Sequence, residues 1–152
     1  MLSIGLSGSN GDQMDTVDAE TRSRMMSGIR GKDTKPEMAV RRFLHARGYR
    51  YRLHRKDLAG RPDIVISRLK VCIFVHGCFW HRHPGCPFAT TPKTRPEFWS
   101  EKFKKNVDRD LGNIDALEAD GWKVLVVWEC ELKRKPETLD RLEYRLRLLE
   151  HA

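Results

Sequence analysis

The sequence has no long apolar run, no internal repeat and no low-complexity segment beyond its first residues. No stretch approaches the ~20 apolar residues that a membrane-spanning helix needs, which excludes a membrane protein. The opening MLSIGLSGSNGDQMD has no basic start followed by an apolar stretch, which excludes a secretory signal peptide. At 152 residues, we expect a soluble, cytoplasmic protein with a flexible leader (1–15), one domain (16–152) and Met14 as a second candidate start.

Negative charge is in deficit. The chain has 21 Asp and Glu against 29 Lys and Arg, a net charge of +8, and most of the excess lies between Arg22 and Lys70. This balance favours a polyanionic partner, and nucleic acid before others. The hydrophobic content of 39% is enough to form a core, which excludes a disordered tail or activation segment.

Cysteine is scarce as well, and its positions are informative. Without an export signal the compartment is reducing, so metal binding or burial is favoured over disulfides. Cys72 lies within an apolar strand pattern and is predicted to be a core residue. Zinc in structural sites takes four thiolate or imidazole ligands, and a complete Cys₃His set remains: Cys78, Cys86, Cys130 and either His81 or His83.

Helical and strand patterns alternate along the chain. Two Thr-x-x-Glu capping signatures, at 34–37 and 94–97, open predicted helices that end at Gly48 and Gly121. Further helices are predicted over 18–29 and around Leu139–Leu149, and strands over 49–53, 63–66, 71–75 and 122–128. The long helix shows an apolar stripe of Trp99, Phe103, Val107, Leu111, Ile114 and Leu117. This order predicts an α/β fold with a small mixed sheet flanked by helices.

Asp63 stands at the beginning of a buried strand, in GRPDIVI. A Pro-Asp entering a strand, followed by a hairpin and a second strand, is the skeleton of the PD-(D/E)xK nucleases, in which such an Asp holds Mg²⁺. Pro-Asp is also a common turn pair, and the second strand ends Phe74-Val75-His76 without the expected acid or lysine. These residues alone leave a nuclease and an ordinary turn both open.

Four longer motifs narrow the choice: GRPDIVI, VCIFVHGCFWHRHPGC, RPEFWSEKFKKNVDRD and GWKVLVVWEC, in that order. Together they resemble the very short patch repair (Vsr) DNA mismatch endonucleases, from about Asp18 to the end of the last strand. The resemblance implies a restriction-endonuclease-like fold of PD-(D/E)xK type with a structural zinc site. It also implies Mg²⁺-dependent nicking of one strand beside a T:G mismatch, of the kind that deamination of 5-methylcytosine produces.

The resemblance also implies individual roles. Asp63 and the main-chain carbonyl of Val75, where the family commonly has Thr, would hold Mg²⁺. His81, oriented by Asp110, would help to activate the attacking water, with contributions from His76, near the lysine position of the nuclease motif, and from Glu37. Zinc would be held by Cys78, His83, Cys86 and Cys130, although Pro84-Gly85 adds one residue to this loop relative to the family pattern. DNA would be contacted by Phe79, Trp80, Trp99, Asn106 and Arg61.

Several of these roles have structural alternatives. Phe79, Trp80 and Trp99 would be a wedge that enters the duplex at the mismatch. Adjacent aromatic residues in a polar loop are hard to bury, so we expect exposed rings; the alternative is a packed small core around zinc. The alternative for Glu37 is a capping-box carboxylate that folds back on its own helix start. Asn106 and Asp110 suit an inward-facing polar pair or a solvated helix edge.

The expected partner is therefore double-stranded DNA with a T:G mismatch, bound by a monomer, with mismatch-repair proteins and a cognate cytosine-5 methyltransferase as associated systems. Two rival functions stay open: a zinc-stabilised DNA-binding module without catalysis, and a related nuclease with a different DNA target. The first explains the charge, the cysteines and the aromatic residues, but gives Asp63, His76 and His81 no common purpose.

Overall fold

The computed structural model describes residues 33–151, and these form two compact units. The larger unit comprises residues 33–76 and 110–151, and the smaller comprises residues 77–109. The predicted leader and the predicted helix over 18–29 lie outside the described residues. None of the helices within residues 33–151 is long and apolar enough to span a membrane.

A mixed four-stranded sheet forms the centre of the larger unit, in the order β1-β2-β3-β4. Its strands are β1 (Arg52–Leu53), β2 (Ile64–Ile66), β3 (Val71–His76) and β4 (Lys123–Trp128). The first three are antiparallel, and β4 runs parallel to β3, from Val71↔Lys123 to His76↔Trp128. The predicted α/β class with a mixed sheet is confirmed. The first strand is shorter than the expected 49–53, since Tyr49 N donates to the carbonyl of Leu44 in the preceding helix.

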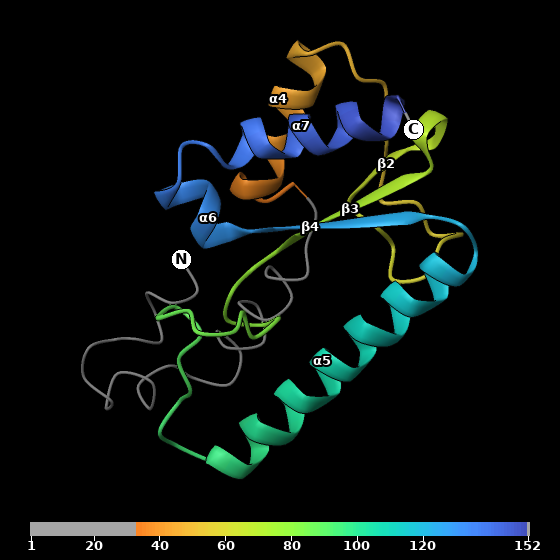
Figure 1. Ribbon diagram of the computed structural model, residues 1–152. Helices are drawn as coiled ribbons and strands as arrows, with labels where there is room; N and C mark the ends of the chain where they lie inside the picture. Colours follow the sequence, from red (N-terminus) through yellow and green to blue (C-terminus); the bar gives the residue numbers. More distant parts are fainter. Residues whose placement is uncertain (1–32, 152) are drawn as a thin grey trace. The chain divides into compact units, whose positions relative to one another are not determined.

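One face of this sheet is covered by α4 (Lys35–Ala46) and α7 (Thr138–Glu150) (Figure 1). Helix α4 begins as its capping signature predicts, with Glu37 N donating to Thr34 Oγ1 at 3.3 Å. Leu142 and Leu146 of α7 are buried at the predicted helical spacing. The core on this face is made of Val40, Leu44, Tyr49, Ile64, Ile66, Val71, Ile73, Leu125, Val127, Leu142 and Leu146.

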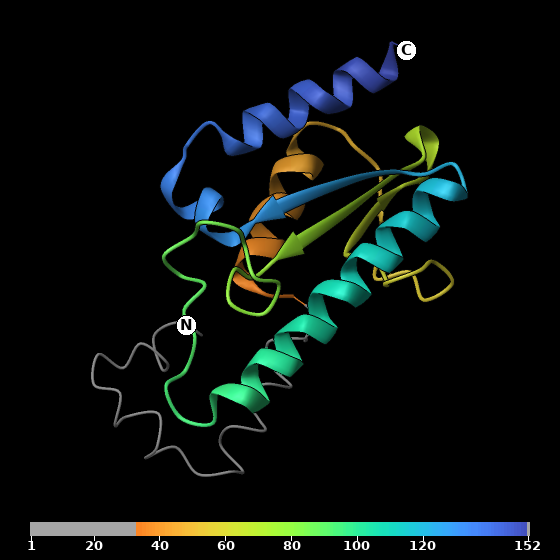
Figure 2. The same ribbon diagram turned by 60° about the horizontal axis from the view of Figure 1, so that its bottom comes forward.

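The other face of the sheet packs against the C-terminal part of α5 (Pro96–Ala119), as Figure 2 shows. Its core consists of Val65, Cys72, Phe74, Leu117 and Trp122. Cys72 has no exposed surface, which confirms its predicted place in the core. Leu111 is 57% exposed, so its predicted burial is wrong; it lies between two packed stretches of α5, one around Phe103 and the other around Leu117.

Two short helical segments complete the larger unit, and neither was predicted. A 3-10 turn, η1 (Ser67–Leu69), joins β2 to β3 and ends at Lys70, which is left-handed with φ +54°. Helix α6 (Glu129–Arg134) follows β4 directly and carries the buried Cys130. Six residues give too little periodicity for a helix to be read from sequence, but this one sets where the last cysteine lies.

Candidate active site and metal centre

The carboxylate of Asp63 is fixed at the end of the sheet. Asp63 directly precedes β2, and the antiparallel pairing of Ile64 with Ile73 brings it beside the last residues of β3. Its Oδ2 accepts a hydrogen bond from Val75 N at 2.7 Å, a length typical of a charge-assisted bond. The resemblance implies that the Asp63 carboxylate and the main-chain carbonyl of Val75 share a metal site, and the structure places this carboxylate against the Val75 N–H.

The turn before Asp63 explains why the sequence reads Gly-Arg-Pro-Asp. Gly60 has φ +75°, and a Cβ on it would lie 3.0 Å from the Asn113 side chain, so a larger residue is disfavoured by both strain and space. The backbone of Arg61 is also left-handed, with φ +49°, and this residue is exposed. Pro62 is fully buried and anchors the turn. This turn presents a basic residue at the surface two positions before the fixed acid.

His76 and Asp110 of the larger unit and His81 of the smaller unit carry side chains suited to metal binding or proton transfer. His76 is the last residue of β3 and is 6% exposed, and its ring meets the Trp128 ring edge-on with 5.1 Å between centroids. His81 and Asp110 are half-buried. Of the five residues expected to act in catalysis, the larger unit thus holds four, His76 and Asp110 among them, and the smaller unit holds His81.

Glu37 is buried in the larger unit, with 2% of its surface exposed. Its carboxylate Oε2 lies 2.7 Å from His54 Nε2 and 3.4 Å from Arg41 Nη1. The carboxylate thus turns toward these two side chains, and the alternative in which it folds back on its own helix start is wrong. No sequence signal pointed to His54, which follows the strand without a recognisable motif.

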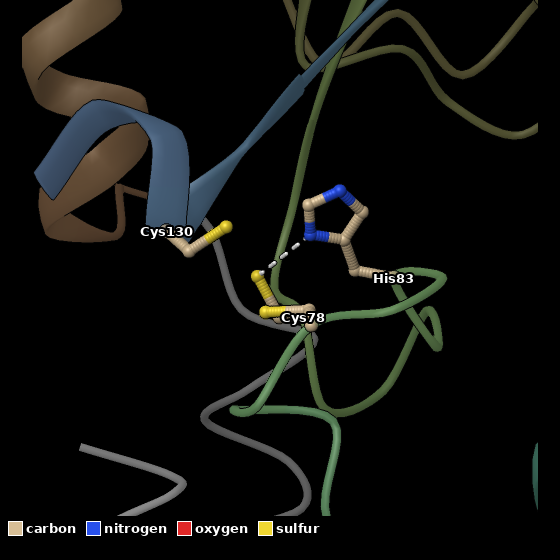
Figure 3. Close-up of side chains that lie close together, drawn as sticks. Cys78, His83 and Cys130 are labelled. Atoms are coloured by element: carbon tan, nitrogen blue, oxygen red, sulfur yellow. Dashed lines mark hydrogen bonds between the residues drawn. The ribbon is translucent and has the colours of Figure 1, made fainter. Parts of the chain in front are cut away.

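Cys78, His83 and Cys86 of the smaller unit offer ligand atoms within 4.8 Å of one another, and Cys130 of the larger unit is the fourth residue of this donor set. Figure 3 labels Cys78, His83 and Cys130, and its dashed line marks the 3.7 Å contact between Cys78 Sγ and His83 Nδ1. Zn–S and Zn–N distances of about 2.3 and 2.0 Å give a tetrahedron with an S–N edge of about 3.5 Å, so the observed spacing fits zinc. The donor set is the expected Cys₃His, with His83 rather than His81 as its imidazole.

The loop of this group is shaped by local turns. His83 N donates to the Cys78 carbonyl at 3.1 Å, and Cys86 N donates to the His83 carbonyl at 3.2 Å. Between them Gly85 takes φ +70°, a conformation that glycine adopts without strain. Gly85 thereby accommodates the residue by which this loop departs from the family pattern.

The aromatic residues of the smaller unit form a packed cluster. Phe79, Trp80 and Trp99 are only 2%, 6% and 3% exposed, and they contact each other and Phe103 with ring centroids 5.0–6.3 Å apart. The expectation of exposed rings is therefore wrong. Because four large rings can bury one another, a polar loop sequence does not prevent their burial.

Arg82, which sequence reasoning did not single out, locks the loop around this cluster. Its guanidinium lies 3.9 Å from the centroid of Phe103 and donates to the carbonyls of Phe79, Ala89 and Thr90. Burial lowers the pKa of Arg82 from its ordinary value. A side chain that donates to several loop carbonyls at once holds the loop in a single conformation.

Asn106 of α5 faces inward and does not lie on a solvated helix edge, which was the other alternative that the sequence left open. It is 5% exposed, donates to the Trp80 carbonyl at 3.4 Å and accepts a bond from Arg109 at 3.0 Å. Asn106 thus ties the helix to the aromatic cluster.

Cys72 offers a chemical check on the distinction between core and metal-binding cysteines. Burial raises the pKa of its thiol to about 11. Because the thiolate is the reactive form, roughly one thiol in a thousand is ionised near pH 8. We expect iodoacetamide to modify Cys72 only after denaturation, as checked by peptide mass mapping; rapid modification in the native protein would contradict its assignment to the core.

Fold and site together define a mixed α/β protein with a fixed carboxylate at the end of its sheet and side chains able to hold metal ions. A family model described as DNA mismatch endonuclease Vsr matches residues 14–86. Type II nicking enzyme V.XorIIP of Xanthomonas oryzae pv. oryzae is 50% identical over 133 residues, which cover 88% of this chain and 94% of that protein.

Two further relatives agree with this match. Type II nicking enzyme V.NmeAIP of Neisseria meningitidis is 46% identical over 138 residues, 91% of this chain and 98% of that protein. DNA mismatch endonuclease Vsr of Escherichia coli K12 is 43% identical over 126 residues, 83% of this chain and 80% of that protein. The chain belongs to the Vsr family of DNA mismatch endonucleases.

Proposed function

We propose that this protein is a Mg²⁺-dependent DNA endonuclease that nicks one strand beside a T:G mismatch arising from deamination of 5-methylcytosine. The observation that carries the proposal is the 2.7 Å hydrogen bond that fixes the Asp63 carboxylate against Val75 N, at the end of the sheet. The names of the relatives, which describe a mismatch endonuclease and nicking enzymes, support the reaction class.

The residues around Asp63 suit a hard cation. A carboxylate that accepts one hydrogen bond can still coordinate a metal, and the neighbouring Val75 carbonyl is a second oxygen ligand of the type that Mg²⁺ takes. When bound, Mg²⁺ supplies charge stabilisation for the phosphodiester under attack. Val75 contributes only its main chain to this role, so a valine in place of the family's usual threonine preserves it.

His76, His81 and Asp110 supply the proton chemistry. We assign His81 to accept the proton of the attacking water, because imidazole is suited to proton transfer near neutral pH. Asp110 is assigned to orient that ring, and the buried His76 to assist. Glu37 contributes a second carboxylate on the sheet side of α4.

DNA binding draws on the charge and on the aromatic cluster. Arg61 is exposed two residues before Asp63 and is assigned to a phosphate contact. Phe79, Trp80 and Trp99 are assigned to the mismatch with Asn106 beside them; because the rings are buried, this role requires the cluster to open against the duplex. A mismatched step costs less to unstack than a paired one, which favours opening at the lesion.

Zinc is proposed as the structural ion of the Cys₃His group. Four thiolate and imidazole ligands leave no position for water, so this ion would stabilise the loop and take no part in hydrolysis. The two metals are thereby separated by ligand chemistry, with sulfur and nitrogen for zinc and oxygen for magnesium.

The proposal is tested with a T:G duplex and a matched T:A duplex, each with Mg²⁺ added or omitted. Omission is preferable to a chelator, because a chelator also removes zinc. We expect Mg²⁺-dependent nicking of the T:G duplex only. The absence of nicking in every arm would refute the enzyme, and equal cutting of both duplexes would refute the mismatch target.

A further inference from the structure

His54 contacts both acidic residues of the proposed active site. Its ring Nε2 lies 2.7 Å from Oε2 of Glu37, and its backbone N donates to the main-chain carbonyl of Asp63 at 3.1 Å. These residues come from separate elements, since Glu37 is in α4 and Asp63 precedes β2. One residue thus joins the two carboxylate-bearing segments.

The backbone of His54 is held in an uncommon conformation to make these contacts. Its φ is +47°, in the left-handed region that residues other than glycine rarely occupy. Such a conformation is strained for a residue other than glycine and persists only where the surroundings enforce it. The turn occurs directly after β1 ends at Leu53, and the ring then reaches the carboxylate of α4.

The contact decides how the Glu37 carboxylate is oriented. At 2% exposure this carboxylate depends on protein partners, because an unpaired buried charge is strongly disfavoured. Arg41 is the more distant partner at 3.4 Å, and it also binds Asp33 at 2.5 Å. Nε2 of His54 is buried and lies 2.7 Å from this carboxylate without the alignment of a hydrogen bond, so the ring acts on Glu37 through close polar contact.

We infer that His54 is a positioning residue of the active site, which fixes the Glu37 carboxylate relative to the Asp63 segment. The inference rests on the proposed nuclease function, because it assigns His54 no contact with DNA or metal. Arg41 already provides the cationic partner of Asp33 and Glu37, which disfavours a metal ion among Asp33, Glu37 and His54.

Two amide substitutions at His54 test the inference, because the Gln and Asn side chains differ in length. The amide nitrogen of Gln lies at the distance of imidazole Nε2 along the side chain, whereas that of Asn lies at the distance of Nδ1. His54→Gln therefore keeps an N–H group beside the Glu37 carboxylate, and His54→Asn does not, although Asn tolerates the left-handed backbone. Exposed His45, on the same α4, provides His45→Gln as a matched control.

We expect His54→Asn to lower the single-turnover nicking rate at saturating T:G duplex by about 10–100-fold, the usual cost of removing a group that orients an active-site ligand. His54→Gln should recover most of that loss, and His45→Gln should match the wild type. DNA affinity, measured by fluorescence anisotropy, should be unchanged in all three. Thermal melting of each variant identifies any loss that is due to unfolding.

A double-mutant cycle with Glu37→Gln separates positioning from a general structural role. If His54 acts through Glu37, His54→Asn should cause little further loss in the Glu37→Gln background. Losses that multiply, a wild-type rate for His54→Asn, or equal loss in His54→Asn and His54→Gln would each overturn the inference. Failure of the wild type to nick refutes the proposed function itself, so the two failures are distinguishable.

Discussion

Asp63→Asn is expected to lower nicking of a T:G duplex by about 10³-fold or more while DNA binding is retained. The carboxylate is assigned to the metal, whose charge stabilisation is worth several kcal/mol in such reactions, and each 1.36 kcal/mol is a factor of ten in rate. The Asn side chain has nearly the same shape, and its carbonyl oxygen can still accept the bond from Val75 N. The fold should therefore be preserved.

The loss is measured as the single-turnover rate at saturating DNA, with affinity measured separately by fluorescence anisotropy. Asp57→Asn is a matched control in the same unit, because Asp57 is exposed and pairs with Arg55 at 2.6 Å. We expect that control to nick at the wild-type rate. Activity of Asp63→Asn within about threefold of wild type would contradict the assignment of Asp63 to the metal.

Cys86→Ser is expected to remove zinc and to lower the melting temperature by about 10 °C. Loss of a structural metal is among the few single changes that cost more than about 4 kcal/mol, and 1 kcal/mol corresponds to roughly 2–4 °C at this chain length. Zinc content is measured by mass spectrometry of the purified protein. Cys72→Ala is the matched control, since Cys72 is a core residue outside the Cys₃His group.

The two neighbouring histidines sharpen this test. His83→Ala should lose zinc, because His83 Nδ1 lies 3.7 Å from Cys78 Sγ. His81→Ala should keep zinc and lose nicking, because His81 is assigned to proton transfer and lies outside the Cys₃His donor set. Full zinc content in Cys86→Ser, or zinc loss in His81→Ala alone, would contradict the ligand set.

Much of the fold follows from short-range sequence rules. Thr34 caps α4 where the capping signature places it, and the apolar run from Val71 forms the central strand of the larger unit. Leu142 and Leu146 are buried at the spacing that a helix requires. Such features depend on a few neighbouring residues, and this explains why sequence patterns predict them.

The failures have a different cause, because they depend on contacts between distant residues. Phe79 and Trp80 are buried by Trp99 and Phe103 from α5, which no local pattern reveals. Likewise, Glu37 meets His54 seventeen positions later in the chain (counted from the residue numbers), and only the folded arrangement of α4 and β1 brings the two together. The sequence could thus nominate Asp63 and the cysteines as candidate site residues. It could not reveal the contacts that orient such side chains, of which the contact between His54 and Glu37 is an example.

A strand-resolved cleavage assay tests the central proposal most directly. A T:G duplex labelled on one strand at a time is incubated with the protein and Mg²⁺, and the products are separated on a denaturing gel. The account predicts a single nick, in the strand that carries the mispaired thymine, with the opposite strand intact. Cleavage of both strands, or no cleavage of either, would contradict it.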